Sequence, residues 1–438
     1  MKKAALHNLG CKVNAYETEA MQQLLEKAGY EIVSFHEKAD VYVINTCSVT
    51  NMADRKSRQM LHRAKKMNPD AAVVAAGCYV QTKEEEAKQD LSIDILIGNN
   101  QKNELVSRLD EFFAERDKDE QTDKVESVVD INNEPQCFEE MSLTKTAEHT
   151  RAFVKVQDGC NQFCSYCIIP YARGRVRSRK LENIVAEVEQ IVDNGIQEIV
   201  ITGIHIASYG KDFNYEITLI DLLEELNKVK GLKRIRLGSI EPTIITDEFV
   251  SRLSKLEKIC DHFHLSLQSG CNETLKRMNR RYTCDEFENG TKLLRKAFPK
   301  AALTTDVIVG FPGETDEEFS KTYDFLKRIA FYKMHIFKYS QRKGTKAAVM
   351  PNQVDGAIKE QRSKVLLELS DENEKMYNSE YVGKTVEVLF EEKDGEFYKG
   401  HTTNYIEVLA KGDNLENAIC DVIVSESCDT HLIGSANI

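Results

Sequence analysis

No segment of this 438-residue chain approaches about 20 unbroken apolar residues, the length that a membrane-spanning helix needs. The first ten residues, MKKAALHNLG, contain two lysines without an apolar stretch behind them, so they do not resemble a secretory signal. We therefore expect no membrane insertion and no secretion, and we expect a cytoplasmic location. With 41% hydrophobic and 30% charged residues, the chain is long enough for two or three domains with packed cores.

The chain also lacks the positive net charge that is common in nucleic-acid-binding proteins, since its formal net charge is -12. Its acidic residues are concentrated in two segments. Residues 110–140 carry 12 acidic and 3 basic side chains, and residues 376–438 carry 12 acidic and 4 basic side chains. The remaining residues therefore have a net charge of +5. That remainder includes RGRVRSRK (173–180), with five cationic residues in eight. Such a run indicates either phosphate contacts or a solvated cationic turn.

Apolar runs alternate with helical stretches through residues 1–109. The runs are AALHNLG, VYVINTC, AAVVAAGC and IDILIGN, and helical stretches such as YETEAMQQLLEKAG lie between them. This alternation favours a parallel sheet with helices on its faces, and therefore an N-terminal α/β domain. Residues 110–145 are acidic and poor in aromatic side chains, and we interpret them as a linker.

Six longer strand and helix repeats in residues 146–375 predict an open or partial (β/α)6 barrel. The candidate strands are 152–156, 198–203, 233–239, 262–267, 303–310 and 333–337. Residues 376–438 contain short β-type runs separated by Gly, Asp and Asn, which predict a small all-β barrel of about five strands. The expected fold class is α/β, with an all-β module at the C-terminus.

Three cysteines lie close together in DGCNQFCSYCIIP (158–170), in the loop after the first strand of the predicted barrel: Cys160, Cys164 and Cys167. Loops at this end of an α/β barrel hold the catalytic groups. A structural zinc site closes with four ligands, and no histidine or fourth cysteine follows nearby. Three thiolates on a 4Fe-4S cluster leave one iron open to a substrate or cofactor. Zinc and three unrelated buried cysteines are the alternatives.

A second trio of cysteines occupies equivalent places in the N-terminal domain. Cys11, Cys47 and Cys78 each end a segment that starts with a candidate strand. Neighbouring parallel strands lie roughly 4.8 Å apart, so residues at three such ends can converge on one edge of the sheet. Any one of these cysteines could be a small buried hydrophobe. Three in the same topological position instead favour a second three-thiol site.

The segment CNQFCSYC (160–167) resembles the CxxxCx(aromatic)C signature of radical S-adenosylmethionine (SAM) enzymes, with Tyr166 at the aromatic position. Nearly the whole chain resembles the methylthiotransferase family, through LGCKVNAYETE (9–19), NTCSVT (45–50), AGCYVQ (76–81), DGCNQFCSYCIIPYARGRVRSR and HLSLQSGCNETLKRMNRRY (264–282). The resemblance implies a radical SAM core in residues 146–375 and a TRAM domain, an OB-like RNA-binding barrel, in residues 376–438.

The resemblance also implies the cofactors, which are SAM and two 4Fe-4S clusters. One cluster would be held by Cys160, Cys164 and Cys167 for radical generation. The other would be held by Cys11, Cys47 and Cys78 for sulfur insertion. By position and resemblance, five residues at strand ends or in the cysteine loop are candidates for SAM contacts, although the glycine could equally be a turn former: Tyr166, Thr202, Gly203, Glu241 and Gln268.

The same family resemblance suggests how RNA would be bound. The candidates for contacts with tRNA phosphates are Arg173, Arg175, Arg177 and Arg179, with Arg280 and Arg281 as helpers. The C-terminal module is acidic, so we expect it to bind RNA through stacking on side chains such as Phe397, Tyr398, His401 and Tyr405.

Branches of the family differ in substrate. LGCKVN and YARGRVRSR look most like the branch that adds a methylthio group to carbon 2 of N6-threonylcarbamoyladenosine next to the tRNA anticodon. Isopentenyladenosine in tRNA and an aspartate of a ribosomal protein are the substrates of the other branches. The expected partners are the anticodon stem-loop of tRNA, a low-potential electron donor such as a flavodoxin or ferredoxin, and a sulfur donor, with no membrane. A non-catalytic metal-cluster protein that binds RNA is the alternative from another class.

Anaerobic reconstitution with iron and sulfide separates these two classes. We expect about eight irons per chain, a brown chromophore and reductive cleavage of SAM, because each trio of thiols would hold one four-iron cluster. Metal analysis that finds one or two zinc ions and no cleavage of SAM would favour the non-catalytic alternative.

Overall fold

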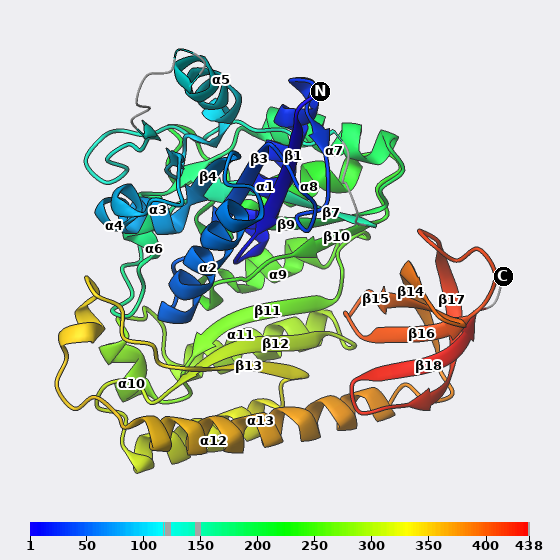
Figure 1. Cartoon of the computed structure of the whole chain (residues 1–438). Coiled ribbons are helices and arrows are strands. Elements are labelled where there is room, and N and C mark those ends of the chain that lie inside the picture. Colours follow the sequence, from blue (N-terminus) through cyan, green and yellow to red (C-terminus); the bar gives the residue numbers. More distant parts are fainter. Residues whose placement is uncertain (117, 119–123, 145–149, 437–438) are drawn as a thin grey trace.

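A computed structural model describes residues 1–116, 118, 124–144 and 150–436 of the chain. Three parts follow one another: a parallel sheet with helices, a central open barrel and a small closed barrel near the C-terminus (Figure 1). Among the described residues, no helix is both long and apolar enough to cross a membrane.

The first sheet is parallel, with the strand order β2-β1-β3-β4-β5-β6. Its strands are β1 (Lys3–Asn8), β2 (Glu31–Ile32), β3 (Val41–Thr46), β4 (Ala72–Gly77), β5 (Ile95–Ile97) and β6 (Val125–Ser127). Its helices are α1 (Lys12–Lys27), α2 (Asn51–Met67), α3 (Cys78–Thr82), α4 (Glu84–Gln89), the 3-10 turn η1 (Lys102–Glu104) and α5 (Leu105–Arg116). Every residue of β3 and β4 is buried, because helices cover both faces of the sheet.

The segment predicted as an acidic linker, 110–145, contributes to this sheet. Helix α5 continues to Arg116, and its Phe112 and Phe113 are buried against the sheet. Strand β6 pairs in parallel with β5, with Val125 opposite Ile95. The linker prediction is therefore wrong for 110–116 and 125–127, where apolar residues among the acidic ones supply a buried face. Residues 117, 119–123 and 145 of that range lie outside the described residues.

The central barrel contains all six predicted strands. They are β7 (Arg151–Asp158), β9 (Glu198–Gly203), β10 (Arg234–Leu237), β11 (His262–Gln268), β12 (Ala302–Val309) and β13 (Lys333–Lys338), with the short antiparallel β8 (Arg177–Ser178) beside β7. Two groups, β10-β9-β7 and β11-β12-β13, are joined by parallel bridges from Ile235 to Ile259 and from Ile240 to Leu265. The six strands therefore form one curved, open sheet, and the predicted partial barrel is confirmed.

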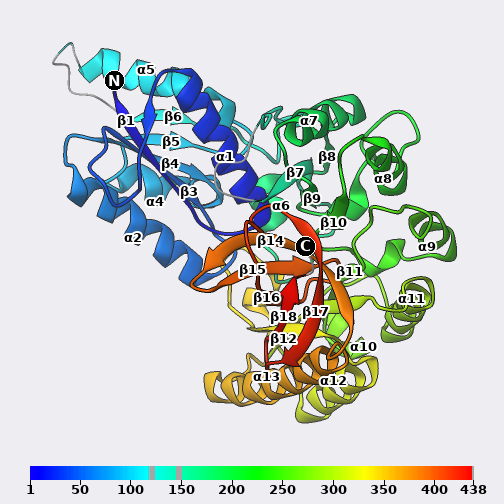
Figure 2. The same ribbon diagram turned by 90° about the vertical axis from the view of Figure 1, so that its right-hand side faces the viewer.

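Helices lie along the outer side of the curved sheet (Figure 2). The helices of this part of the chain are α6 (Ile169–Arg173), which faces α3 of the first domain, α7 (Leu181–Asp193), α8 (Leu219–Lys228), α9 (Asp247–Leu253), α10 (Asn272–Arg277), α11 (Cys284–Ala297), α12 (Asp316–Ile329) and α13 (Gly356–Ser379), with 3-10 turns η2 (Ile206–Ser208), η3 (Pro242–Ile244) and η4 (Lys346–Val349). Three of the helices begin at a threonine that forms a capping box, at Thr218, Thr283 and Thr315.

The C-terminal module is a closed barrel of five strands, as predicted. Its order is β14-β15-β16-β18-β17, from β14 (Thr385–Asp394), β15 (Phe397–Thr402), β16 (Glu407–Lys411), β17 (Ile419–Ser427) and β18 (His431–Ala436). The interior includes Val388, Phe390, Val408 and Leu432. Helix α13 leads from the central barrel to this module (Figure 1).

Tyr405 joins the small barrel to the central one. Its ring stacks on His262 of β11 and on His401, with ring centroids 5.0 and 4.7 Å away. The guanidinium of Arg236, paired with Glu198 at 2.8 Å, lies 4.6 Å from the same ring. The predicted stacking role in RNA binding is therefore wrong for Tyr405 and His401, because contacts within the protein occupy both rings.

A second link, between the central barrel and the first domain, lies on the opposite side of the central barrel. Arg342, which follows β13, donates to Asp54 of α2 at 2.6 Å and to the Ser48 hydroxyl at 2.9 Å. Asn51 donates to the Gln341 carbonyl at 3.0 Å. The loop after the last barrel strand is thereby fixed to the segment that follows Cys47.

Replacement of Tyr405 by alanine tests the contact between the two barrels. Loss of the ring leaves His262 and Arg236 without their stacking partner, and we expect unfolding to become easier by about 3 kcal/mol. Urea unfolding and limited proteolysis of the C-terminal module measure the effect. The matched control is Phe397→Ala on β15, for which we expect a smaller loss. Equal effects of the two substitutions would contradict this role for Tyr405.

Candidate active site

The loop that carries the first cysteine trio is shaped by Gly159, directly after β7. Gly159 has φ +70°, and a Cβ atom there would lie 1.8 Å from the Arg175 carbonyl oxygen. Only glycine fits at such a close approach. The Cys160 amide donates to the Gly174 carbonyl at 3.0 Å, which folds the loop back on itself at the C-terminal end of the barrel strands.

All three thiols of this loop are partly buried. Desolvation raises the pKa of Cys160 to about 11 and that of Cys167 to about 12. A pocket of about 100 Å³ is lined by Cys164 and Cys167 together with Phe163, Tyr171 and Lys346. Thiols of this kind become ligands when a bound metal replaces their protons.

Arg280 connects this loop to the neighbouring strand ends. Its guanidinium donates to Cys164 Sγ at 3.2 Å and to the Glu241 carboxylate at 2.8 Å. Glu241 also lies 3.6 Å from His205 Nε2. Although desolvation raises the pKa of Glu241, His205 and Arg280 hold it below its ordinary value. Arg280 is therefore committed to the cysteine loop, and its predicted helper role at tRNA phosphates is wrong.

The predicted SAM-contact residues surround this loop. Thr202 and Gly203 end β9, and a Cβ atom at Gly203 would lie 3.0 Å from the Gln157 carbonyl oxygen. Gln268 ends β11 with φ +71°. Tyr166 packs edge-on against Phe311, with ring centroids 6.3 Å apart. Four strands thus bring candidate residues to the same end of the barrel, while their contacts with SAM stay predictions.

The second trio lies at the ends of three neighbouring strands. Cys11 precedes α1, Cys47 directly follows β3, and Cys78 directly follows β4, and these strands are adjacent in the order β1-β3-β4. A Cβ atom at Gly10 would lie 3.1 Å from Cys47 Sγ, so the chain before Cys11 passes close to that thiol. Burial, with smaller contributions from Cys78 and Cys11, raises the pKa of Cys47 to about 11. The three residues therefore lie at one edge of the first sheet, while their role as ligands of a second cluster stays a prediction.

The donor sets fit iron-sulfur clusters better than single ions. A tetrahedral zinc ion with bonds of about 2.3 Å needs sulfur atoms about 3.8 Å apart. In the described part of the chain, the one trio of metal-binding side chains with all ligand atoms within 4.8 Å of each other is His264, Asp306 and His335. Neither cysteine trio is therefore drawn together around one small ion. Wider spacing and three soft ligands suit a cluster of several irons.

Two asparagines and an arginine connect the two trios, and sequence analysis did not assign them this role. The Asn99 amide donates to Cys78 Sγ at 3.4 Å and to the Ala172 carbonyl at 2.8 Å. Arg173 donates to Asn14 Oδ1 at 2.7 Å, and the Cys11 thiol donates to the same oxygen at 3.7 Å. The spacing of Asn14, three residues after Cys11 on α1, was the one available signal.

Arg173 also belongs to a buried network of charges. It pairs with Glu17 at 2.8 Å and with Asp158 at 3.1 Å, and Lys155 and Lys102 pair with Glu17 at 2.7 and 3.2 Å. Desolvation raises the pKa of Glu17, but Arg173, Lys102 and Lys155 lower it well below its ordinary value. The carboxylates are therefore charged, and the network fixes α1 against the end of the cysteine loop.

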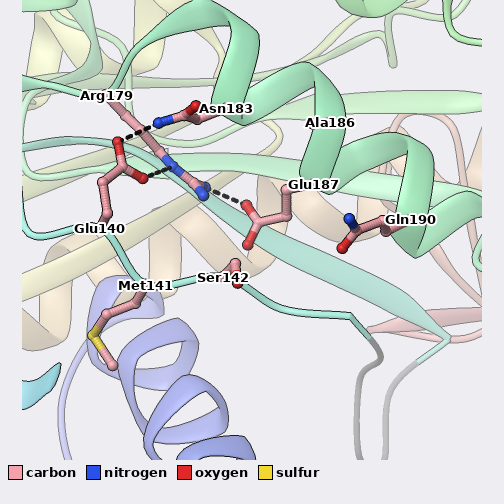
Figure 3. Close-up of a pocket in the computed structure, with 8 residues that line it drawn as sticks. All are labelled: Glu140, Met141, Ser142, Arg179, Asn183, Ala186, Glu187 and Gln190. Atoms are coloured by element: carbon pink, nitrogen blue, oxygen red, sulfur yellow. Dashed lines mark hydrogen bonds and ion pairs between the residues drawn. The ribbon is translucent and has the colours of Figure 1, made fainter.

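Three of the four arginines predicted to bind tRNA phosphates are buried. The exposed fractions of Arg173, Arg177 and Arg179 are 0%, 3% and 2%. Arg179 lies in a pocket where it pairs with Glu187 and Glu140, as Figure 3 shows. The prediction is wrong for these three residues, because acidic groups from other elements already neutralise them. Arg175 is exposed, with its guanidinium 4.5 Å from the Phe163 ring centroid.

Comparisons with known proteins agree with this geometry. The Radical SAM superfamily model matches residues 154–326, and the model of the uncharacterized protein family UPF0004 matches residues 3–98. The chain is 44% identical to a threonylcarbamoyladenosine tRNA methylthiotransferase MtaB of Bacillus subtilis, with 94% of this chain and 91% of the relative covered. It is 40% identical to the Aquifex aeolicus protein of that name, with coverage of 94% and 97%.

Other relatives have a different named substrate. The tRNA-2-methylthio-N(6)-dimethylallyladenosine synthase of Moorella thermoacetica is 38% identical, with 92% of this chain and 91% of the relative covered. Among solved structures, the radical SAM methyltransferase TsrM from Kitasatospora setae matches with a TM-score of 0.58 at 14% identity. That match covers 80% of this chain and 74% of TsrM, and it supports the fold alone.

Removal of Arg173 tests the buried network. In Arg173→Met, Glu17 and Asp158 lose a charged partner, and we expect the free energy of unfolding to fall by about 3 to 5 kcal/mol. The matched control is Arg175→Met, which removes an exposed guanidinium and should change stability by less than about 0.5 kcal/mol. Urea unfolding measures both variants. A larger loss in the Arg175 variant would rule out the assigned roles.

Proposed function

Because the chain belongs to the radical SAM tRNA methylthiotransferase family, we propose that it adds a methylthio group to carbon 2 of N6-threonylcarbamoyladenosine next to the tRNA anticodon. The protein is a radical SAM methylthiotransferase with SAM and two 4Fe-4S clusters as cofactors. One observation supports this choice of nucleoside: both relatives at 40% identity or more described above are named for it.

In this proposal, Cys160, Cys164 and Cys167 hold the cluster that binds SAM. When bound, that cluster and SAM supply a one-electron reduction that produces a hydrogen-abstracting radical. Carbon 2 of a purine has no acidic proton at neutral pH, so substitution there requires such chemistry. Arg280 holds Cys164 and Glu241 in place through its two hydrogen bonds.

The remaining assignments extend this proposal. Cys11, Cys47 and Cys78 hold the second cluster, from which sulfur is inserted. The proposed contacts with SAM come from five residues around the strand ends: Tyr166, Thr202, Gly203, Glu241 and Gln268. The buried Glu241 carboxylate shares Arg280 with Cys164, and it can also accept hydrogen bonds from a cationic amino group.

The partners follow from the reaction. The substrate is the anticodon stem-loop of tRNA, for which Arg175 is the exposed member of the cationic run. The reaction also needs a low-potential electron donor such as a flavodoxin or ferredoxin, and a sulfur donor. We place the protein in the cytoplasm because its tRNA substrate is used there.

Isopentenyl-type adenosine in tRNA is the second candidate substrate, since the Moorella thermoacetica relative is named for it. A ribosomal-protein aspartate has no such support among the relatives described above. A non-catalytic RNA-binding protein is inconsistent with membership of this enzyme family.

Mass spectrometry of tRNA nucleosides from a deletion strain tests the proposed substrate. We expect 2-methylthio-N6-threonylcarbamoyladenosine to disappear and its precursor without the methylthio group to accumulate. The wild-type gene should restore the product, and the matched Cys160→Ala variant should not, because SAM could no longer be cleaved. If the isopentenyl derivative disappears instead, the second candidate substrate is correct.

A further inference from the structure

Three polar side chains meet on the inner face of the central barrel. His264, Asp306 and His335 come from the adjacent strands β11, β12 and β13, and Asp306 is directly opposite His335 in the strand register. One ligand-type atom from each of the three lies within 4.8 Å of the other two. Neither the cluster ligands nor the proposed SAM contacts include any of them.

His264 is held in place by both ring nitrogens. Its Nδ1 lies 3.0 Å from the Thr304 hydroxyl, and its Nε2 lies 3.2 Å from the Asp306 carboxylate. His335 is exposed and Asp306 is half-buried, so solvent reaches both. A ligand can therefore reach the Asp306 carboxylate and the His335 imidazole, and the contact with His264 holds Asp306 in place.

Lys12 supplies a positive charge at the same place. Its charge interacts with those of Asp306 of β12, His335 of β13 and Arg236 of β10. Burial, together with Arg236, lowers the pKa of Lys12 to about 8, so most of the amine is still protonated at neutral pH. The Lys12 side chain is accessible to solvent, although the surrounding barrel partly desolvates its ammonium group. No hydrogen bond or ion pair of this side chain is found among the described residues. It also directly follows Cys11, the first residue of the second trio.

The neighbouring arginines do not share this availability. Arg151 pairs with Glu391 at 2.9 Å, Arg236 pairs with Glu198 at 2.8 Å, and Arg234 pairs with Glu387 at 2.7 Å. Their charges are therefore neutralised by partners. Lys12 is left as a cation that can bind an incoming anion.

The charges decide between two kinds of ligand. His264, Asp306 and His335 alone have the composition of a divalent-cation site. The Lys12 ammonium would repel such a cation across a region of low dielectric constant. A ligand that carries a carboxylate together with N–H or O–H groups instead matches Lys12 and Asp306 at the same time.

We propose that Lys12, Asp306 and His335 form the subsite for the N6 substituent of the target adenosine, with the Lys12 ammonium binding its carboxylate. This inference rests on the proposed function, in which the substituent is a threonylcarbamoyl group. Asp306 accepts hydrogen bonds from the N–H or O–H groups of the substituent, and His335 closes the side of the subsite formed by β13.

The arrangement explains selection between the two candidate substrates. An apolar isopentenyl group would leave the Lys12 ammonium and the Asp306 carboxylate without partners after displacing their water. Sites that are built to bind polar groups discriminate strongly against analogues that lack them. The subsite therefore favours a substituent that carries a carboxylate.

The test uses the reconstituted holoenzyme and two synthetic anticodon stem-loop RNAs. One carries N6-threonylcarbamoyladenosine, and the other carries the methyl ester of the same nucleoside, which removes the negative charge. For the wild type we expect kcat/KM to be about 10- to 100-fold higher on the acid than on the ester. In Lys12→Met the two values should become equal, because activity on the acid falls while activity on the ester does not.

Two further variants complete the design. Lys27→Met, at the exposed last turn of the same helix, is the matched control and should keep the wild-type ratio. Asp306→Asn should lower kcat/KM on both RNAs. Iron content and RNA-independent cleavage of SAM are measured for each variant, so that damage to the clusters is recognised separately from a changed acid-to-ester ratio.

The outcomes separate this inference from the proposed function. If the wild type acts on the acid RNA and Lys12→Met keeps the wild-type ratio, the subsite is wrong and the proposed function stands. If the wild type modifies only an isopentenyladenosine RNA, both are wrong. One equivalent of bound Co²⁺ that is lost in Asp306→Asn would show a cation site and overturn the inference.

Discussion

Glu17 carries the charge on which the contact between the first sheet and the central barrel depends. Its buried carboxylate is surrounded by Lys102 from the first domain and by Lys155 and Arg173 from the barrel. A carboxylate without water is tolerated only when such partners are in place. Because α1 begins directly after Cys11 and Arg173 ends the helix after the cysteine loop, these ion pairs hold the two thiol trios in a fixed relation.

Parallel strands supply the other constraint on the site. In both the first sheet and the central barrel, the cysteines follow the carboxyl ends of strands, where the chain leaves the sheet and backbone groups become available. Asn99 connects Cys78 to the helix after the cysteine loop, since its amide donates to Cys78 Sγ and to the carbonyl of Ala172 in α6. The two halves of the active site are therefore joined by hydrogen bonds and ion pairs rather than by a flexible segment.

The sequence was informative where the signal is local. Strand periodicity predicted all six barrel strands. Close spacing pointed to the first cysteine trio, and the repeated position after candidate strands pointed to the second, because both patterns can be read locally. The cationic run was misread because its partners, Glu17, Asp158 and Glu187, are dispersed along the chain. Tyr405 was misread for the same reason, since His262 is more than a hundred residues away. Sequence alone does not show that His264, Asp306 and His335 lie together, because this depends on the register of β11, β12 and β13.

The position of Glu17 also constrains the order in which the chain acquires its structure. Domains generally fold from the N-terminus during synthesis, so α1 is made long before residues 155 and 173 leave the ribosome. Lys102 is the cation of this network that the first domain itself supplies to Glu17. The packing around Glu17 is therefore completed by sequence that is synthesised later. The sheet edge that carries Cys11, Cys47 and Cys78 reaches its final packing only after Cys160, Cys164 and Cys167 have been synthesised.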